Sequence, residues 1–462
     1  MLTRGDKMAL DLRAYLDLLR CLAPEELVEI YHPVSLFYET TALALELERQ
    51  RKCPALLFHN LKEVGGPLLS NIFASQRRIA LALGVPEREI ASAWQFKAMR
   101  RLSPLHVTDG PVKDIRKIGE EADLLSLPVP VHFEADAGAY ITGGIAVARD
   151  PDTGLGNLSY ARLQIKGPRI MGVSLHSRGN FWDFQRRAEA QNKRLEVAVV
   201  VGVHPALSLA AATRLPLGED ELELAGGLLG QPVEVTPAET VDLLVPAYAE
   251  LVIEGYIEPN QRADEGPFGE YTGYASARST RHIFHVTAIT HRSDMIYQDV
   301  IPGASSEHLA LSKTSRVPQF FESVKKVLPN VVAMSYPHSG THFHCYLSMK
   351  KTLDGQPRQA MALLFGLDMY LKLVVVVDDD IDVFDEQQVL WAVATRFQAD
   401  RDLFVLSGMP CNLLDPSSNG GVGAKLGLDA THKFGSEVQP LNFPPEVHRR
   451  VDELLKLVGG DS

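Results

Sequence analysis

The spacing of apolar residues divides the chain into three parts. Between residues 10 and 105, apolar positions recur at helical spacing and alternate with short apolar runs, a pattern typical of an α/β domain. The pattern predicts helices at 10–21, 40–51, 80–83 and 87–99 and a strand at 55–59. The next segment, 124–132, contains Pro128 and Pro130, which exclude a helix and predict an extended connector near a domain boundary.

Between residues 140 and 290 the pattern changes to short runs of β-prone residues separated by glycine, proline and aspartate. So many short strands indicate a barrel or a curled sheet. We expect strands at 140–148, 158–165, 170–175, 196–201, 232–236, 250–257 and 282–289, interrupted by helices at 181–192 and 219–229.

The last third returns to alternating helices and strands. Its final predicted helix, 445–458, is amphipathic and can dock on a partner subunit. The sequence therefore predicts an α+β chain of three domains, at 1–120, 121–305 and 306–462. We expect helices at 314–327, 359–365 and 386–399, strands at 331–334, 344–349, 371–377 and 403–406, and a glycine-rich loop at 418–425.

Composition narrows the class of protein. The 462 residues are 45% hydrophobic and 23% charged, which are globular values. A net charge of -12 without a basic stripe argues against nucleic-acid binding. No apolar run approaches the ~20 residues of a membrane span, and residues 1–6 lack a signal core. The four cysteines form no C-x-x-C pair, so we expect a reduced, cytoplasmic enzyme.

The acidic stretch 263–274 is the first candidate for chemistry. Glu265 and Glu270 stand five positions apart, which places them on opposite faces of a strand or about 140° apart on a helix. Gly266 and Pro267 favour a turn that brings the two acids together. We therefore predict a loop that presents both carboxylates to one site.

The predicted strand 158–165 offers partners for these acids. Asn157 and Ser159 share one face, whereas Arg162 falls on the other unless the strand twists or bulges. Taken alone, this pattern more often marks an ordinary surface strand. An arginine near two glutamates, however, lowers the pKa of one and leaves the other free to exchange a proton, which suits acid-base chemistry.

In its ordered motifs the sequence resembles the UbiD-type decarboxylases, which use prenylated FMN. A single such motif is weak evidence, but the ordered set extends over most of the chain. The motifs are Asn157-x-Ser159-x-x-Arg162, Pro232-Val233-Glu234-Val235, 245–247, 250–257, Glu265 to Tyr274, 377–382 and 427–431.

The resemblance implies a central split β-barrel domain of the flavin-reductase type and a catalytic network of Arg162, Glu265 and Glu270. In this network Arg162 pairs with Glu265, and Glu270 is the proton donor. The cofactor would lie against Asn157, Ser159, Tyr160 and Arg162, with further contacts from Asn180, Glu234 and Lys425.

The resemblance also implies a divalent ion, Mn²⁺ or Mg²⁺, with K⁺ nearby. Asn157 and Glu234 would supply the oxygen ligands that such hard cations prefer. The third family ligand is commonly a histidine, but counting back from Trp182 gives Asn180. Asn180 can ligate through its carbonyl oxygen, and His176 can do so only if the loop length differs.

Two charged segments of the last third allow two interpretations each. Lys425, in the predicted glycine-rich loop, can meet a phosphate or be a solvated lysine. Asp378 to Asp380 end a predicted strand, where they can form a functional edge or cap the strand.

The chemistry itself requires a cofactor. Decarboxylation of an unsaturated or aromatic acid leaves electrons on an sp² carbon, and no side chain offers an electron sink. The resemblance names prenylated FMN, supplied by a flavin prenyltransferase, and implies a reversible non-oxidative decarboxylation through a cofactor adduct. Glu270 would protonate the carbon after carbon dioxide leaves.

Specificity is expected from the segment 302–316 and from the histidines and aromatic residues at 336–344. Although a lone histidine is more often structural, His308, Arg316 and His338 are candidates for the substrate pocket. We hypothesise that His308 and Arg316 read a polar or carboxylate group remote from the reacting carbon. Furan, pyrrole, indole or hydroxybenzoate acids are favoured over a polyprenyl substrate, and carboxylation is the possible reverse direction.

Two other functions fit the acidic pair. A glycosidase also uses two carboxylates, but sugar platforms are missing and the chain has only three tryptophans. A noncatalytic flavin-binding or assembly subunit of a multisubunit carboxylase is the second alternative, against which the intact Arg162, Glu265 and Glu270 argue. The terminal helix and the family resemblance together predict a homodimer or a hexamer built from dimers.

Overall fold

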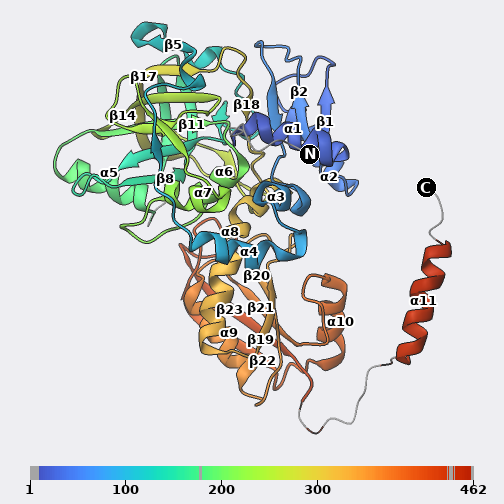
Figure 1. Cartoon of the computed structure of the whole chain (residues 1–462). Coiled ribbons are helices and arrows are strands. Elements are labelled where there is room, and N and C mark those ends of the chain that lie inside the picture. The colour runs from blue at the N-terminus through green and yellow to red at the C-terminus, as the bar shows by residue number, and fades with distance from the viewer. Residues whose placement is uncertain (1–9, 176–178, 434, 436–440, 442, 459–462) are drawn as a thin grey trace.

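The computed structural model describes residues 10–175, 179–433, 435, 441 and 443–458. They form three domains, which confirms the predicted α+β organisation (Figure 1). Helix α8 (Ser306–Val327) runs from the upper pair of domains into the lower, C-terminal domain. Among the described residues, no helix is both long enough and apolar enough to cross a membrane.

The N-terminal domain packs four helices against a small sheet. Its first helix begins where the Asp11 carboxylate accepts the N–H of Ala14, at 2.8 Å, and it buries an apolar face that includes Leu12 and Leu16. The elements are α1 (Leu12–Leu22), α2 (Glu39–Arg49), α3 (Gln76–Leu83), α4 (Ile90–Ala98), β1 (Leu27–Ile30), β2 (Ala55–Phe58) and β3 (Leu68–Ser70). Strand β18 (Tyr297–Gln298) returns from the central domain and pairs with β3, which ties the two domains together.

The central domain is a curled antiparallel sheet. The described strands form a nine-stranded sheet in the order β6-β9-β10-β17-β14-β11-β7-β8, with β5 paired to β17. They are β5 (Ile115–Ile118), β6 (Tyr140–Ile141), β7 (Ile145–Arg149), β8 (Gly156–Tyr160), β9 (Arg162–Gly167), β10 (Ile170–Ser174), β11 (Leu195–Val201), β14 (Leu251–Glu265) and β17 (Ser279–His291). No strand was predicted at the residues of β5, which fall within the predicted first domain but pair with β17 of this sheet.

Smaller elements surround this sheet. Helix α6 (Pro205–Ala211) escaped prediction because all its residues are buried, so it shows no alternation of apolar and polar positions. The others are α5 (Asn180–Ala190), α7 (Glu221–Leu229), β4 (Leu105–His106), β12 (Glu234–Pro237), β13 (Leu244–Pro246), β15 (Phe268–Gly269) and β16 (Ala275–Ser276).

The C-terminal domain is a five-stranded sheet, among the described residues, in the order β19-β20-β21-β23-β22. Strands β20, β21 and β23 are parallel, and their carboxyl ends therefore meet at one edge. Its elements are α8, α9 (Gln356–Leu367), α10 (Glu386–Arg396), β19 (Val331–Ser335), β20 (His344–Met349), β21 (Leu373–Asp378), β22 (Leu403–Pro410) and β23 (Val422–Ala430).

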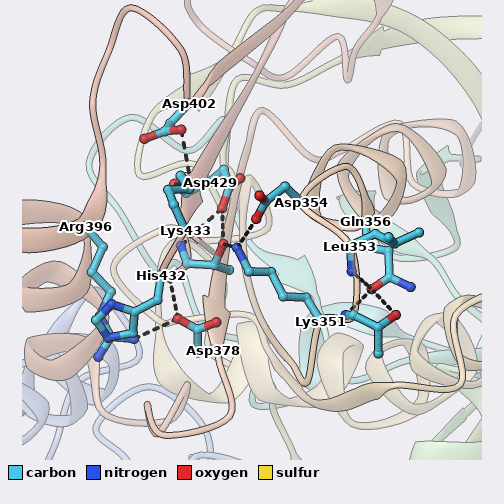
Figure 2. Close-up of polar contacts among 12 residues, drawn as sticks. Lys351, Leu353, Asp354, Gln356, Asp378, Arg396, Asp402, Asp429, His432 and Lys433 are labelled. Carbon is cyan, nitrogen blue, oxygen red and sulfur yellow. Dashed lines mark hydrogen bonds and ion pairs between the residues drawn. The ribbon is translucent and has the colours of Figure 1, made fainter. Parts of the chain in front are cut away.

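At that edge a charged cluster, which we call the strand-end network, joins the strand ends to α10 (Figure 2). Asp378 accepts bonds from Arg396, at 2.9 Å, and from the backbone N–H of His432, at 2.6 Å. Lys433 lies 3.0 Å from Asp429. These acids thus bind neighbouring groups of the protein, and of the two interpretations of Asp378 to Asp380, the contacts favour the structural one.

Helix α11 (Pro445–Val458) confirms the predicted terminal helix and lies apart from the three domains (Figure 1). Its apolar residues Val447, Val451 and Leu454 recur at helical spacing and are exposed. Such a stripe is typical of a helix that packs on another surface.

Candidate active site

The structure brings Arg162, Glu265 and Glu270 together. Arg162 donates from Nη2 to Glu265 Oε2, at 2.5 Å, and from Nη1 to Glu270 Oε1. Its guanidinium also lies over the ring of Phe268, 4.8 Å from the centroid. One arginine therefore faces two carboxylates, a group of three side chains that we call the Arg162 triplet.

Arg162 reaches this position because the expected strand 158–165 is broken. Strand β8 ends at Tyr160 and β9 begins at Arg162, so the alternation of faces restarts after Ala161. Strand β9 then pairs with β10, where Arg162 lies opposite Ser174. The break removes the conflict in which Arg162 faced away from Asn157 and Ser159.

The two glutamates come from the end of a long strand and from the turn after it. Glu265 is the last residue of β14, paired with Ser279, rather than part of a loop as expected. Gly266 then adopts a φ of 83°, which favours glycine, and lets the chain reverse. The N–H of Glu270 bonds the carbonyl of Tyr274, at 3.0 Å, which closes the turn.

Burial dominates the electrostatics of the triplet. The side chain of Glu265 is 0% exposed and that of Glu270 is 12% exposed. Burial raises the pKa of Glu270; Arg162 lowers it again, and the charge of Glu265 adds to the rise. One guanidinium balances the charge of only one carboxylate, and the raised pKa of Glu270 means that this acid holds a proton more readily than a free glutamate does.

Several buried polar atoms of the triplet and of β8 make no hydrogen bond within the described residues. Among the described residues, Arg162 Nε, Glu265 Oε1 and Ser159 Oγ are buried and make no hydrogen bond. Buried polar groups are nearly always satisfied in a complete protein. These atoms therefore indicate a place where a polar ligand binds.

Asn157 meets a carboxylate that the sequence did not single out. Its amide donates to both carboxylate oxygens of Glu221, at 2.9 and 2.8 Å, and Glu221 also accepts the N–H of Leu158. Burial raises the pKa of Glu221 to about 7. Asp220, the N-cap of α7, precedes Glu221 in the chain, and burial also raises the pKa of its carboxyl group. The only signal in the sequence was the acidic start of the predicted helix 219–229.

Two further predicted ligands, Glu234 and Asn180, make other contacts in the described structure. Glu234 opens β12, and no hydrogen bond joins it to Asn157 within the described part of the chain. Asn180 begins α5 and donates to the Leu215 carbonyl, at 3.3 Å, beside a cavity of about 340 Å³. His176 lies outside the described residues. In the described ranges, no three His, Cys, Asp or Glu side chains are grouped as for a metal ion.

Tyr160 and Lys425 occupy different surroundings. Tyr160 ends β8, and burial raises the pKa of its hydroxyl. Lys425 lies in β23, not in the glycine-rich loop, because the strand begins at Val422. Its buried ammonium donates to the carbonyls of Met369, at 2.7 Å, and Leu371, at 2.5 Å. These bonds give Lys425 a place in the core of the C-terminal domain.

An aromatic cluster joins the triplet to the C-terminal domain. Tyr271, next to Glu270, lies 6.4 Å from His308 and 4.8 Å from His342, measured between ring centroids. Phe343 and Tyr370 complete the cluster. His342 and Phe343 lie in the segment 336–344 from which specificity was expected, whereas Tyr271 and Tyr370 were not predicted to line a pocket.

The predicted pocket residues divide around this cluster. Arg316 lies 4.3 Å from the centroid of Tyr370 and bonds Asp368, at 2.5 Å. Burial lowers the pKa of His308, which contacts the Gly303 carbonyl at 3.0 Å. His338 is half exposed and lies 3.2 Å from Glu48 of α2, so it joins two domains at the edge.

Family models match three successive stretches. The descriptions are the N-terminal, Rift-related and C-terminal domains of 3-octaprenyl-4-hydroxybenzoate carboxy-lyase, at residues 18–96, 105–305 and 311–430. Together they span most of the chain.

Solved structures agree. HmfF from Pelotomaculum thermopropionicum, a UbiD-class enzyme in complex with FMN, is 37% identical over 96% of this chain and 99% of that one, with a TM-score of 0.90. Its evolved dimeric form, in complex with prFMN, is 35% identical over 96% of this chain and 98% of that one, with a TM-score of 0.86. The vanillic acid decarboxylase of Sedimentibacter hydroxybenzoicus in closed form is 28% identical over 98% of this chain and 100% of that one, with a TM-score of 0.84. The chain therefore belongs to the UbiD family of decarboxylases, as its motifs predicted.

Proposed function

We propose that this protein decarboxylates an aromatic or heteroaromatic acid with prenylated FMN as cofactor, with Glu270 as the proton donor. The observation that carries the proposal is the Arg162 triplet, in which one guanidinium holds two buried carboxylates beside unpartnered polar atoms. A buried acid whose pKa is raised can deliver a proton to carbon at neutral pH. The reaction is reversible, so carboxylation at high carbon dioxide belongs to the same proposal.

The roles of the two glutamates differ. Glu265 is fully buried against Arg162 and fixes the guanidinium. Glu270 is bound to the same arginine but keeps some exposure, from which it can reach substrate. Protonation of Glu270 leaves Arg162 and Glu265 as a neutral ion pair, which stabilises the protonated acid before transfer.

The residues around the triplet fit the cofactor. Ser159 Oγ and Arg162 Nε are buried hydrogen-bonding atoms without partners, and a polar ligand such as a flavin would satisfy them. Asn157 and Tyr160 lie on the same strand, β8. When bound, prenylated FMN supplies the electron sink that side chains lack.

A divalent ion also fits, with one added ligand. Asn157 and Glu221 meet in a buried place with Asp220 beside them, and the described contacts of these acids include no basic side chain. Buried carboxylates without a counter-ion favour a hard cation. We infer that Asn157 and Glu221 would hold Mn²⁺ or Mg²⁺ with K⁺ nearby, and that Glu234 and Asn180 remain candidate further ligands.

The substrate pocket is proposed at the aromatic cluster. Its flat rings suit a furan, pyrrole, indole or hydroxybenzoate acid. His308 and Arg316 would read a polar or carboxylate group remote from the reacting carbon, whereas His338 lies at the edge. Replacing His308 or Arg316 by alanine should raise KM for a dicarboxylate or hydroxylated acid more than for a plain ring acid. An unchanged specificity profile would remove this assignment.

Co-expression with a flavin prenyltransferase tests the proposal. We expect purified protein with prenylated-flavin absorbance and flavin mass by native mass spectrometry. It should release carbon dioxide from members of an aromatic acid panel. Colourless protein without flavin would contradict the proposal, and flavin-loaded protein inactive on the panel would favour the noncatalytic-subunit alternative.

Assembly through α11 is part of the proposal. The exposed residues Val447, Val451 and Leu454 would pack on a second copy in a homodimer or in a hexamer built from dimers. Light scattering of a Val451→Glu, Leu454→Glu variant should give a smaller particle than the parent chain. An unchanged mass would exclude α11 from the interface.

A further inference from the structure

The segment 133–140, which we call the clamp segment, lies along the turn that carries the two glutamates. Asp136 accepts the N–H of Gly269, at 2.8 Å, through Oδ1 and the N–H of Phe133, at 3.0 Å, through Oδ2. The N–H of Ala137 donates to the carbonyl of Pro267, at 2.9 Å. Asp136 thus holds the residue directly before Glu270.

Tyr140 binds the same turn at its other end. Its hydroxyl accepts the N–H of Gly266 and donates to the carbonyl of Pro267, both at 3.2 Å. Its ring packs against Phe268, with centroids 4.6 Å apart, and Phe268 in turn supports Arg162. The polar contacts of the clamp segment therefore reach both ends of the turn.

Packing leaves little freedom at this point. A Cβ added at Gly269 would lie 2.4 Å from Cδ2 of Phe133, so the ring occupies the space beside the glycine. The N–H that Asp136 accepts is therefore held between a packed ring and a carboxylate. A movement of Asp136 would be transmitted to Glu270 through one peptide unit.

We propose that Asp136 is a positioning residue for the proton donor: it places Glu270 against Arg162 and adds a negative charge beside the turn that carries Glu270. The inference rests on the proposed function, because it assumes that Glu270 donates the proton. It adds a residue outside the triplet and outside every motif that supported the family assignment.

Charge supports the second part of this role. The charged and titratable groups that face Glu270 are Arg162 from β9, Glu265 from β14, Asp136 from the clamp segment and the neighbouring Tyr271. Burial is the main cause that raises the pKa of Glu270; Arg162 opposes it, and the charges of Glu265 and Asp136 raise the pKa further. Removing the charge of Asp136 should therefore make Glu270 a stronger acid.

Two substitutions separate charge from position. Asp136→Asn removes the charge and keeps one oxygen that can accept the Gly269 N–H, while its NH₂ group replaces the oxygen that accepts the Phe133 N–H. We expect kcat at low pH to stay within about threefold of the parent value, and the alkaline limb of the kcat profile to move down by about 0.5–1 pH unit. Asp136→Ala also removes the acceptor, and kcat should fall by about 10–100-fold across the profile.

A matched control is Asp123, an aspartate in the stretch that precedes the clamp segment. Asp123 accepts the N–H of Leu125, at 2.9 Å, but has no bond to the turn. Asp123→Asn should change neither kcat nor the position of the alkaline limb. Thermal unfolding of all variants shows whether a fall in kcat merely follows loss of folded protein.

A second readout does not depend on turnover. In protein labelled with ¹³C at the glutamate carboxyl, the Glu270 signal is the one lost in Glu270→Gln, and its titration gives the pKa directly. Asp136→Asn should move this titration to lower pH in the full-length chain. The proposal would be overturned if neither Asp136→Asn nor Asp136→Ala changed the titration of Glu270 or moved the alkaline limb of the kcat profile. Absence of decarboxylation by the flavin-loaded parent protein would instead overturn the proposed function, while the titration still tests the electrostatic role of Asp136.

Discussion

Arg162 and Arg396 each hold two carboxylates, but the pKa shifts of the carboxylates differ between the two sites. Arg162 binds Glu265 and Glu270 in the central domain, whereas Arg396 binds Asp378 and Asp380 at the edge of the C-terminal sheet. The pKa of Glu270 is raised, mainly by burial. The pKa of Asp380 is lowered, mainly by its hydrogen bond with Arg396.

The exposure of the side chains and the number of hydrogen-bond donors explain why the two sites differ in pKa. The side chain of Asp380 is 42% exposed, so water shares its charge, whereas that of Glu270 is 12% exposed. Asp378 also accepts the His432 N–H, which adds a second donor to its carboxylate. The same side-chain chemistry thus produces an acid that can carry a proton at one site and a fixed ion pair at the other.

The largest expected effect separates the two arginine sites by activity. Glu270→Gln keeps the shape of the side chain but removes the proton, and kcat should fall about 10²–10⁴-fold in carbon dioxide release assays. The matched change Asp380→Asn should leave kcat within about twofold of the parent value. In the described structure Asp380 accepts its side-chain hydrogen bonds from Arg396 of the strand-end network. Full activity of Glu270→Gln would end the proton-donor assignment.

The second prediction separates the sites by stability. Arg396→Met removes the cation that joins α10 to Asp378 and Asp380, and the side chain of Arg396 is only 2% exposed. Because both acids keep some access to water, we expect a loss of about 1–3 kcal/mol in urea unfolding, below the cost of a fully buried broken pair. The activity per folded molecule should stay unchanged. A stable but inactive variant would place the strand-end network in the reaction.

A third, smaller effect concerns Lys425. Lys425→Met leaves the carbonyls of Met369 and Leu371 without their donor, which should cost about 1–2 kcal/mol in urea unfolding. Flavin affinity measured by fluorescence should not change, whereas Ser159→Ala should weaken it. Loss of flavin binding in Lys425→Met would return this lysine to the cofactor site.

The comparison also shows what sequence can predict. The turn between Glu265 and Glu270 was predictable because glycine and proline act locally. The strand break at Ala161 was not, although it decides which way Arg162 points, because it depends on pairing with distant strands. The partner of Asn157 is Glu221, 64 positions away, and spacing along the chain carries no information on such a contact.

Lys425 illustrates the opposite error. A lysine in a glycine-rich segment suggested a phosphate loop, but strand pairing with β22 extends from Leu428 back to Val422 and includes Lys425. Tertiary contacts therefore override a local composition that is typical of loops. In the same way, Asp136 carried no motif, and its importance follows only from the turn that it contacts.

The smallest effect is a difference in how stability depends on pH. Glu270, whose pKa is raised, favours folding below its unfolded pKa of about 4.3, and this contribution is lost as pH rises toward the folded pKa. Asp380, whose pKa is lowered, favours folding above its unfolded pKa of about 3.9, and this contribution is lost as pH falls toward the folded pKa.

Urea unfolding between about pH 3.5 and pH 7 therefore compares the parent with Glu270→Gln and Asp380→Asn. As pH falls, the parent should gain stability relative to Glu270→Gln and lose its advantage over Asp380→Asn. The second change should be the smaller, because the exposed Asp380 is screened by solvent. Parallel curves for the two variants would show that the two arginine sites do not differ in electrostatics, and the assignment of roles would then rest on activity alone.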